Sequence, residues 1–283
     1  MDWRMSMEYK TLNNGIKIPV LGFGTFQISG KQCVESVLQA LKQGYRLIDT
    51  AEAYGNEKEI GEAIRLSNVS RKELFIVSKV NFTSYENTKE VIKQSLEHLQ
   101  TDYLDLVLLH WPFGHYYQAW RDLEDLYNQG IIKAIGISNF DMDRMIDLIH
   151  FNHVVPAVNQ IETHVLCQRQ EEHQWLNKYQ VAHFAYAPLG QGQLQDMFEI
   201  PIIQELALKY QKTPAQICLR YLTQSDQIVI CKTIHEQRMI ENISIFDFML
   251  TEEEMNKVKA IDRKQIQIGK ANQPEFVEFA MTW

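Results

Sequence analysis

Short apolar runs alternate with segments of helical period along almost the whole chain. Eight of these runs predict β-strands, at residues 20–25, 46–50, 74–80, 104–110, 133–138, 157–162, 181–187 and 228–232. Most are nearly continuous apolar runs, and Leu-Val-Leu-Leu at 106–109 is the clearest. Continuous rather than alternating apolar positions are typical of strands buried on both faces, as in a parallel sheet wrapped by helices.

The segments between these strands predict amphipathic helices. Apolar residues recur at i, i+3, i+4 and i+7 in the stretches 34–41, 142–149 and 203–210, so each helix has one face for the core. An unbroken series of eight strand–helix units favours a closed α/β barrel, the (β/α)8 TIM barrel, over an open doubly wound sheet.

An N-terminal β-hairpin is predicted before the first barrel strand. Residues 8–12 and 16–20 flank Asn14-Gly15, a pair that accepts the positive φ angles of a type I′ turn. We expect this hairpin to cap the bottom of the barrel.

Chain length and composition fit one barrel. The 283 residues exceed slightly the roughly 250 that such a barrel needs. No Pro/Gly/Ser-rich linker or composition shift divides the chain, so residues 1–283 are expected to form a single domain. The hydrophobic share of 45% and the charged share of 23% are typical of a soluble globular protein.

Charge and cysteine usage narrow the partners and the compartment. Lys and Arg total 28 against 36 Asp and Glu, and this net charge of −8 argues against a general nucleic-acid or anionic-membrane surface. The chain contains neither the apolar core of a signal peptide nor a run long enough to span a membrane, so a cytoplasmic protein is expected. Four scattered cysteines without a CxxC pair predict free thiols: Cys33, Cys167, Cys218 and Cys231. No metal is expected, because His150 and His153 lack partners at ligand spacing.

Polar residues end three successive predicted strands. The second strand ends in Asp49, the third in Lys79 and the fourth in His110, and Tyr54 follows Asp49 by five residues. Active sites of α/β barrels lie at the carboxyl ends of the strands, so these four side chains are expected to meet. Each has an ordinary alternative when it is considered alone: a turn or cap residue, a solvated strand end, a core histidine, a loop aromatic. Their occurrence together favours a catalytic site.

The chemistry of these side chains suggests a division of roles. A nearby ammonium favours the phenolate, so Lys79 is expected to lower the pKa of Tyr54. Asp49 would hold and compensate Lys79, and His110 could hydrogen-bond and orient a carbonyl oxygen beside the phenol. Such a site protonates an oxygen on which negative charge develops. Hydride addition to a carbonyl requires that proton.

A hydride donor implies a nucleotide site. Gly22-Phe-Gly24 begins like the dinucleotide fingerprint GxGxxG, but Gln27 occupies the sixth position and the pattern fails; a P-loop is absent as well. After the eighth strand, Thr233-x-x-Glu236 has the pattern of a capping box that starts a helix. That helix start, with Lys232 and Arg238, suits a phosphate monoester such as the one that distinguishes NADPH from NADH. A basic surface turn is the alternative for this segment.

The motifs come together as a family pattern. Arg-Leu-Ile-Asp-Thr-Ala (46–51), Tyr-Gly-Asn-Glu (54–57), Leu-His-Trp-Pro (109–112), Gly-Ile-Ser-Asn-Phe (136–140), Asn-Gln-Ile-Glu (159–162) and Ala-Tyr-Ala-Pro-Leu-Gly (185–190) occur in this order. In these motifs the chain resembles the aldo-keto reductases from about residue 9 to residue 283. Its short loops resemble the microbial branch that includes diketogluconate and methylglyoxal reductases.

This resemblance implies NADPH-dependent reduction of aldehydes or ketones to alcohols, with Asp49, Tyr54, Lys79 and His110 as the catalytic residues and Tyr54 as the general acid. Ser138, Asn139 and Gln160 would hold the nicotinamide carboxamide, and Tyr186 would stack on its ring. The group around the 2′-phosphate and adenine would be Lys232, Thr233, Arg238, Glu241 and Asn242. Gly24, Thr25 and Leu189 complete the expected cofactor residues. Phe26 and Trp111 would wall the substrate pocket, with ordinary packing at the top of the barrel as the alternative.

Three positions depart from the family pattern. Cys231 stands where proline is usual, Thr233 replaces serine, and Ala187 replaces the serine after the stacking tyrosine. Thr233 keeps a hydroxyl, so the preference for NADP(H) is expected to persist, with a modest loss of affinity from the other two.

Two other functions are compatible with the residues: a non-catalytic barrel that senses NADPH or binds a partner, and a lyase or aldolase in which Lys79 forms a Schiff base. The partner expected of a reductase is a small-molecule carbonyl compound. Its identity, the stereochemistry, and the choice between monomer and dimer stay open at this stage.

Overall fold

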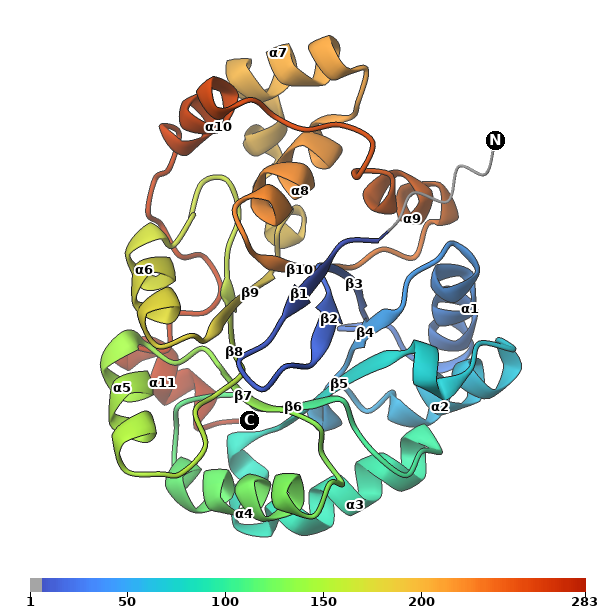
Figure 1. Ribbon diagram of the computed structural model, residues 1–283, viewed down its shortest axis with the longest axis vertical. Helices are drawn as coiled ribbons and strands as arrows, with labels where there is room; N and C mark the ends of the chain where they lie inside the picture. Colours follow the sequence, from blue (N-terminus) through green and yellow to red (C-terminus); the bar gives the residue numbers. More distant parts are fainter. Residues whose placement is uncertain (1–6) are drawn as a thin grey trace.

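A closed barrel of parallel strands forms the centre of the protein, as predicted. The computed structural model describes residues 7–283, so the first six residues of the predicted domain lie outside it. The strands follow the order β10-β3-β4-β5-β6-β7-β8-β9 around the barrel, and helices surround them (Figure 1). Each strand begins and ends within two residues of its predicted bounds. The bounds are β3 Leu21–Gly24, β4 Leu47–Asp49, β5 Phe75–Val80, β6 Leu106–Leu109, β7 Ile135–Ser138, β8 Val158–Glu162, β9 Ala182–Tyr186 and β10 Ile228–Cys231.

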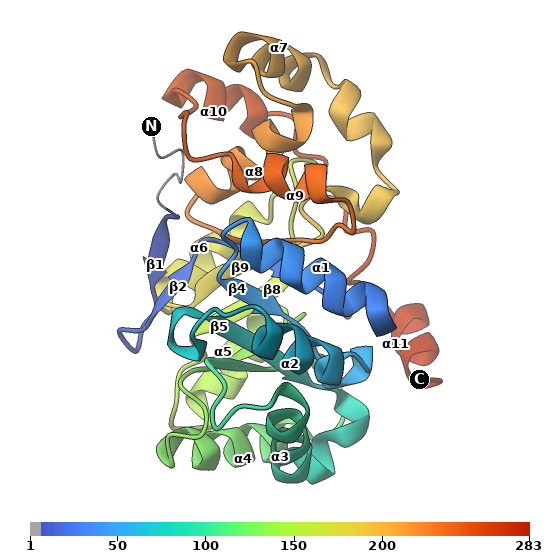
Figure 2. The ribbon, with the colours of Figure 1, turned by 90° about the vertical axis from the view of Figure 1, so that its right-hand side faces the viewer.

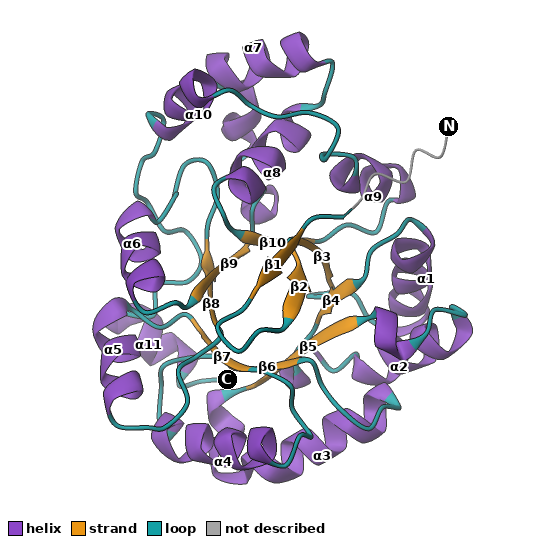
Figure 3. Cartoon of the chain, viewed as in Figure 1, coloured by secondary structure: helices purple, strands orange, loops and turns teal. Residues whose placement is uncertain are grey.

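Helices connect consecutive strands and form the outer ring (Figure 3). The α-helices are α1 Gly30–Lys42, α2 Glu57–Leu66, α3 Thr88–Leu99, α4 Tyr116–Asn128, α5 Met142–His150, α6 Gln170–Lys178, α7 Pro201–Tyr210, α8 Pro214–Gln224, α9 Glu236–Ile243, α10 Glu252–Lys259 and α11 Pro274–Ala280. Short 3-10 helices are η1 Glu52–Tyr54, η2 Arg71–Glu73, η3 Phe82–Asn87, η4 Gly190–Gly192 and η5 Gln195–Glu199. Among the described residues, no helix has the length and apolar character required to cross a membrane.

The predicted hairpin lies across the amino-terminal ends of the barrel strands. Its strands β1 Tyr9–Thr11 and β2 Lys17–Pro19 pair in antiparallel register (Figure 2). Leu12 and Ile18 from this hairpin are buried with the apolar side chains that fill the barrel interior, such as Leu108 and Phe184. Burial of each such side chain contributes roughly 1.5–3 kcal/mol, so the hairpin closes this end as an apolar plug. The polar residues at the strand ends therefore lie at the opposite, carboxyl-terminal end of the barrel.

The type of turn in the hairpin was predicted wrongly. A type I′ turn needs positive φ at both central residues, but of Asn14 and Gly15 only Gly15 has it (φ 85°). The amide of Gly15 instead donates to Leu12 O at 2.9 Å, and the amide of Leu12 donates to Ile16 O at 2.8 Å. These bonds define a three-residue loop in which a turn over 12–15 ends in a left-handed glycine. The extra residue sets the register of the two strands.

Candidate functional site

The side chains at the ends of β4 and β5 form a buried ion pair. Lys79 Nζ lies 2.6 Å from Asp49 Oδ1 and also donates to Thr50 O at 2.8 Å. The Lys79 side chain is 1% exposed and that of Asp49 is 7% exposed. Burial lowers the pKa of Lys79, and the charge of Asp49 opposes that shift. The pair lies at the carboxyl ends of the strands, where sequence analysis expected these two side chains.

Tyr54 reaches this pair from the loop after β4. Its hydroxyl lies 3.5 Å from Lys79 Nζ. The loop is fixed by Asn56, which is fully buried: its Nδ2 donates to Thr25 O at 2.9 Å and to Ile28 O at 2.8 Å. Thr50 Oγ1 donates in turn to Asn56 Oδ1 at 2.8 Å. Sequence analysis did not select Asn56, because nothing in its local sequence indicates these long-range bonds.

The pKa of Tyr54 differs from the prediction. Burial raises it well above its ordinary value, and the charge of Asp49 raises it further. The expected lowering by Lys79 fails because burial and the charge of the Asp49 carboxylate, which both raise the pKa, outweigh it. Tyr54 is consequently a protonated hydroxyl in this state of the protein.

His110 completes the group from the end of β6. Its backbone amide donates to Val80 O at 2.9 Å, and its ring centroid lies 5.8 Å from that of Tyr54. Burial and the charge of Lys79 lower the pKa of His110 well below its ordinary value, so the ring is neutral at pH 7. Within residues 7–283, its buried Nδ1 has no hydrogen-bond partner. The structure thus brings together all four residues that the strand-end argument selected.

Amide side chains border this group on β7 and β8. Gln160 Nε2 donates to Asp49 Oδ2 at 2.8 Å, so one end of its amide supports the ion pair. Asn139 Nδ2 donates to His110 O at 3.1 Å, and Ser138 Oγ donates to Gln160 O at 2.9 Å. The hydroxyl of Tyr186 donates to Asn139 Oδ1 at 2.8 Å. The four residues predicted to hold a nicotinamide are therefore neighbours of one another and of the ion pair.

Aromatic rings pack against Tyr54 and His110. Phe26 is 41% exposed, with its ring centroid 4.9 Å from that of Tyr54. Trp111 stacks on His110 and on Phe113, with centroids 5.8 Å apart in both cases. Phe26 thus lies beside Tyr54, and Trp111 lies beside His110; their roles as walls of a substrate pocket stay predictions.

The carboxyl-terminal tail adds rings that sequence analysis missed. The centroid of Phe276 lies 5.2 Å from that of Trp111, and that of Trp283 lies 5.4 Å from it. The density of aromatic residues in this short tail was the available signal.

The predicted phosphate-binding segment follows β10, but its helix begins later than expected. The amino-terminal cap of α9 is His235, and the capping box of Thr233 and Glu236 does not form. The Thr233 hydroxyl accepts a bond from the amide of His235 at 3.2 Å, so the chain makes one more bend before the helix. Lys232 and Arg238 are exposed, and neither pairs with a carboxylate in the part of the chain that the structure describes.

The remaining predicted cofactor residues have local roles of their own. A methyl group on Gly24 would lie 2.7 Å from Ile230 Cγ2, so close packing of β3 against β10 requires glycine there. Thr25 is fully buried and its hydroxyl donates to Asp49 O at 2.9 Å. Leu189 is half-buried at the start of η4, Glu241 Oε1 accepts a bond from Gln237 at 3.2 Å, and Asn242 is buried.

The four cysteines are buried thiols outside any disulfide. Cys231 Sγ lies 3.7 Å from Gly22 O, and burial raises the pKa of its thiol to about 11. Ala187 follows Tyr186 with a left-handed φ of 51°. Among residues 7–283, no cluster of three or more His, Cys, Asp or Glu side chains could hold a metal ion.

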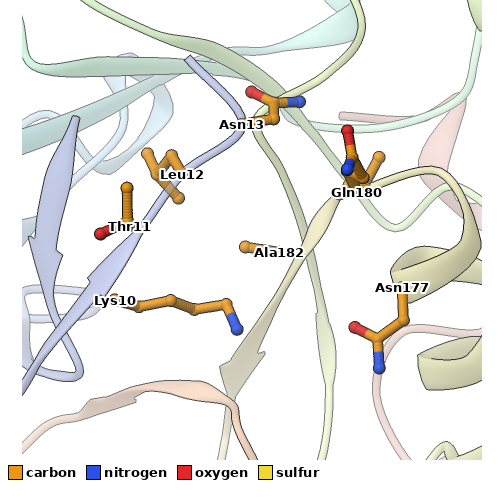
Figure 4. A pocket seen from close by; sticks show the side chains of 8 residues that line it. Lys10, Thr11, Leu12, Asn13, Asn177, Gln180 and Ala182 are labelled. Atoms are coloured by element: carbon orange, nitrogen blue, oxygen red, sulfur yellow. The ribbon is translucent and has the colours of Figure 1, made fainter. Parts of the chain in front are cut away.

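A cavity of about 300 Å³ lies at the other end of the barrel, beside the hairpin (Figure 4). Lys10, Asn13, Asn177 and Gln180 line it, and Lys10 is paired with Asp226 at 2.5 Å. None of the predicted catalytic residues contributes to this cavity. It is therefore separate from the site at the carboxyl ends of the strands.

The fold and the site define an α/β-barrel protein with a buried Asp–Lys pair beside a tyrosine and a histidine. Residues 20–263 match the model of the aldo/keto reductase family, and the chain belongs to this family. It is 38% identical to methylglyoxal reductase DkgA of Escherichia coli over 255 residues, which cover 89% of this chain and 92% of that protein. It is 42% identical to glyoxal reductase of Bacillus subtilis over 258 residues, covering 90% and 92% of the two chains.

Solved structures agree with these relatives. The aldo-keto reductase MGS-M4 from a Medee basin deep-sea metagenome library superposes with a TM-score of 0.90 at 38% identity, covering 92% of this chain and 97% of that one. Aldose reductase from Schistosoma japonicum gives a TM-score of 0.88 at 31% identity, covering 95% and 98%. The family and its reductase-named relatives support an oxidoreductase that reduces carbonyl compounds.

Proposed function

We propose that this protein reduces aldehydes and ketones to alcohols with NADPH as hydride donor and Tyr54 as proton donor. The observation that carries the proposal is the contact of the Tyr54 hydroxyl, 3.5 Å from Lys79 Nζ, with an ion pair closed to solvent. The small α-dicarbonyl substrates in the names of its relatives, methylglyoxal and glyoxal, are the first compounds to test.

The residues present fit a dinucleotide phosphate. Lys232 and Arg238 offer exposed positive charge without carboxylate partners among residues 7–283, as a 2′-phosphate requires. Asn139 and Gln160 offer amide groups that match a carboxamide in both donor and acceptor capacity. When bound, NADPH supplies the hydride that the carbonyl carbon accepts.

The protein's own residues then account for the oxygen end of the reaction. A neutral His110 can donate a hydrogen bond to the carbonyl oxygen and orient it beside Tyr54. Because the pKa of Tyr54 is raised, the hydroxyl holds its proton until charge develops on that oxygen, which is then the stronger base. The proton passes from the phenol to the oxygen, the product is an alcohol, and the nearby Lys79 ammonium stabilises the phenolate that is left.

The Schiff-base alternative is disfavoured by the bonding of Lys79. Its ammonium donates to Asp49 Oδ1 and Thr50 O and approaches the Tyr54 hydroxyl, and its side chain is 1% exposed. A nucleophilic lysine needs room for a carbonyl carbon at its amine, and these contacts and the burial of the side chain leave none.

The test is the fall in NADPH absorbance with a panel of aldehydes and diketones, measured in parallel for wild type and Tyr54→Phe. Loss of a general acid typically costs about 10²–10⁴-fold in turnover, and NADPH binding should be retained. Unchanged turnover in Tyr54→Phe would remove this residue from its role. Binding of NADPH without turnover of any carbonyl would favour the sensor alternative.

A further inference from the structure

A buried carboxylate outside the predicted catalytic group holds three consecutive backbone amides. Glu162, the last residue of β8, is 2% exposed. Its Oε1 accepts from the amide of Gln267 at 2.9 Å, and its Oε2 accepts from the amides of Ile268 at 2.6 Å and Gly269 at 2.9 Å. His164 Nε2 lies 3.2 Å from Oε1. The bonds join the end of a barrel strand to the tail that leads into α11.

The carboxylate is ionised at neutral pH. Burial alone would raise the pKa of Glu162, but the bonds from His164 and the three amides outweigh it and lower the pKa below its ordinary value. Bonds from backbone amides to a charged acceptor are about twice as strong as neutral ones. Glu162 is therefore a strong local anchor for residues 267–269, which belong to no helix or strand.

The anchored segment lies against two residues of the proposed nicotinamide site. A methyl group on Gly269 would overlap the Tyr186 hydroxyl and would lie 2.8 Å from Asn139 Oδ1. Tyr186 is also the register partner of Glu162 across β8 and β9. The backbone at Gly269 thus packs directly on the pair in which Tyr186 donates to Asn139. Only glycine permits so close an approach.

The tail forms the wall of the site farthest from the hairpin. In Figure 2, α11 lies at the end of the barrel opposite β1 and β2. Beyond residues 267–269 the tail carries Phe276 and Trp283, which contact Trp111. Glu162 therefore fixes the position of residues 267–269, from which the aromatic part of the tail continues. A cover that excludes water strengthens the electrostatic interactions beneath it.

We propose that Glu162 is a positioning residue: its carboxylate holds residues 267–269 as a roof over the nicotinamide site and so slows the release of bound NADPH. The inference rests on the proposed function, because it takes Tyr186 and Asn139 as the residues beside the nicotinamide. Glu162 itself has no contact with the reacting atoms. Its effect passes through the backbone of the tail.

The experiment compares Glu162→Gln with a matched control, Glu124→Gln. Glu124 is a 5% exposed carboxylate of α4 whose Oε1 accepts from the amides of His153 at 2.8 Å and Val154 at 2.7 Å. It anchors a loop that leads into the amino-terminal end of β8, away from the site. In Glu162→Gln one of two bonded oxygens becomes an NH2 group that faces backbone N–H donors, so anchoring bonds are lost. In Glu124→Gln the amide oxygen can take the place of Oε1, so this variant controls for the removal of a buried carboxylate charge alone.

Two quantities are measured for each protein: amide hydrogen exchange of residues 267–269, and the NADPH dissociation rate followed by stopped-flow fluorescence. In Glu162→Gln we expect faster exchange of these amides and NADPH release about tenfold faster, as for the loss of one charge-assisted bond. KM for NADPH should rise while kcat with saturating cofactor changes little. Glu124→Gln should leave NADPH release at the wild-type rate even if its thermal stability falls.

Each contrary result overturns a definite part of the reasoning. Unchanged exchange in Glu162→Gln means that the carboxylate does not hold the segment, and faster exchange with unchanged NADPH release means that the segment is not a roof. Equal acceleration in both variants reduces the effect to general destabilisation. If the wild-type protein binds no NADPH, the proposed function itself is wrong. If the wild type binds NADPH normally and Glu162→Gln releases it at the same rate, only the role of Glu162 is wrong.

Discussion

Replacement of Lys79 by methionine should destabilise the protein strongly, because it leaves the buried carboxylate of Asp49 without its cationic partner. Asp49 would lose the 2.6 Å bond from Lys79 and keep only the 2.8 Å bond from Gln160 Nε2. With 7% of its side chain exposed, Asp49 has little access to water as a substitute. Removal of one partner from a buried ion pair typically costs about 3–5 kcal/mol. We expect Lys79→Met to lose an amount of unfolding free energy in this range.

Removal of both charges should restore much of that stability without restoring activity. In the double variant Asp49→Asn, Lys79→Met, no charge is left buried, and the asparagine carbonyl can still accept from Gln160. Neutral replacement of a buried pair is often close to neutral for stability. The double variant should thus lose roughly 2–3 kcal/mol less unfolding free energy than the two single variants lose together. Carbonyl reduction should stay absent, because the Lys79 ammonium beside Tyr54 is gone.

Urea unfolding of the wild type, the two single variants and the double variant measures this coupling, and NADPH oxidation measures activity on the same samples. A coupling below about 0.5 kcal/mol, the level at which independent sites add, would refute the reading of Asp49 and Lys79 as one closed pair. Activity retained in the double variant would refute the part that Lys79 plays beside Tyr54.

Three other measurements test separate features. Arg238→Ala should weaken NADPH binding by about 10–100-fold and NADH binding little, whereas Arg65→Ala, at an exposed arginine of α2, should affect neither; equal losses for both cofactors would dismiss the 2′-phosphate site. The free energy of unfolding should fall as pH drops below about 6.5, by about 1.4 kcal/mol per pH unit for each of His110 and His183. Burial lowers the pKa of both residues, so below that pH the unfolded chain binds more protons than the folded one. His183→Gln should reduce that slope in unfolding experiments at pH 7 and 5.5, and an unchanged slope would contradict the assignment. EDTA should leave carbonyl reduction intact, and a strong loss would reveal a metal requirement.

The parts of the fold that sequence predicts well are those with a local cause. Continuous apolar runs such as 106–109 are typical of strands buried on both faces, and the number of such strands favours the barrel. The residue that ends each run points to the rim, which is why Asp49, Lys79 and His110 are brought together as expected. The single-domain boundary and the catalytic and cofactor roles of individual residues stay predictions.

The features that sequence missed depend on distant partners. Glu162 meets its amides 105 to 107 residues along the chain, and no spacing rule connects a strand end to a tail so far away. The pKa of Tyr54 was predicted in the wrong direction because the shift depends on burial and on the charge of Asp49, which both raise it. The capping box at Thr233 failed since the hydroxyl bonds to the amide of His235 instead.

Gln160 shows why stability and chemistry are difficult to separate at this site. Its Nε2 donates to Asp49 Oδ2 across 111 residues of sequence, so the amide supports the buried ion pair. An amide has a second end, and Gln160 Oε1 can still accept from a carboxamide in the proposed nicotinamide site. The ion pair that stabilises the barrel rim and the group that would orient the cofactor thus share one side chain. In the proposed function, the bond to Asp49 would fix the orientation of the amide and with it the direction of this acceptor.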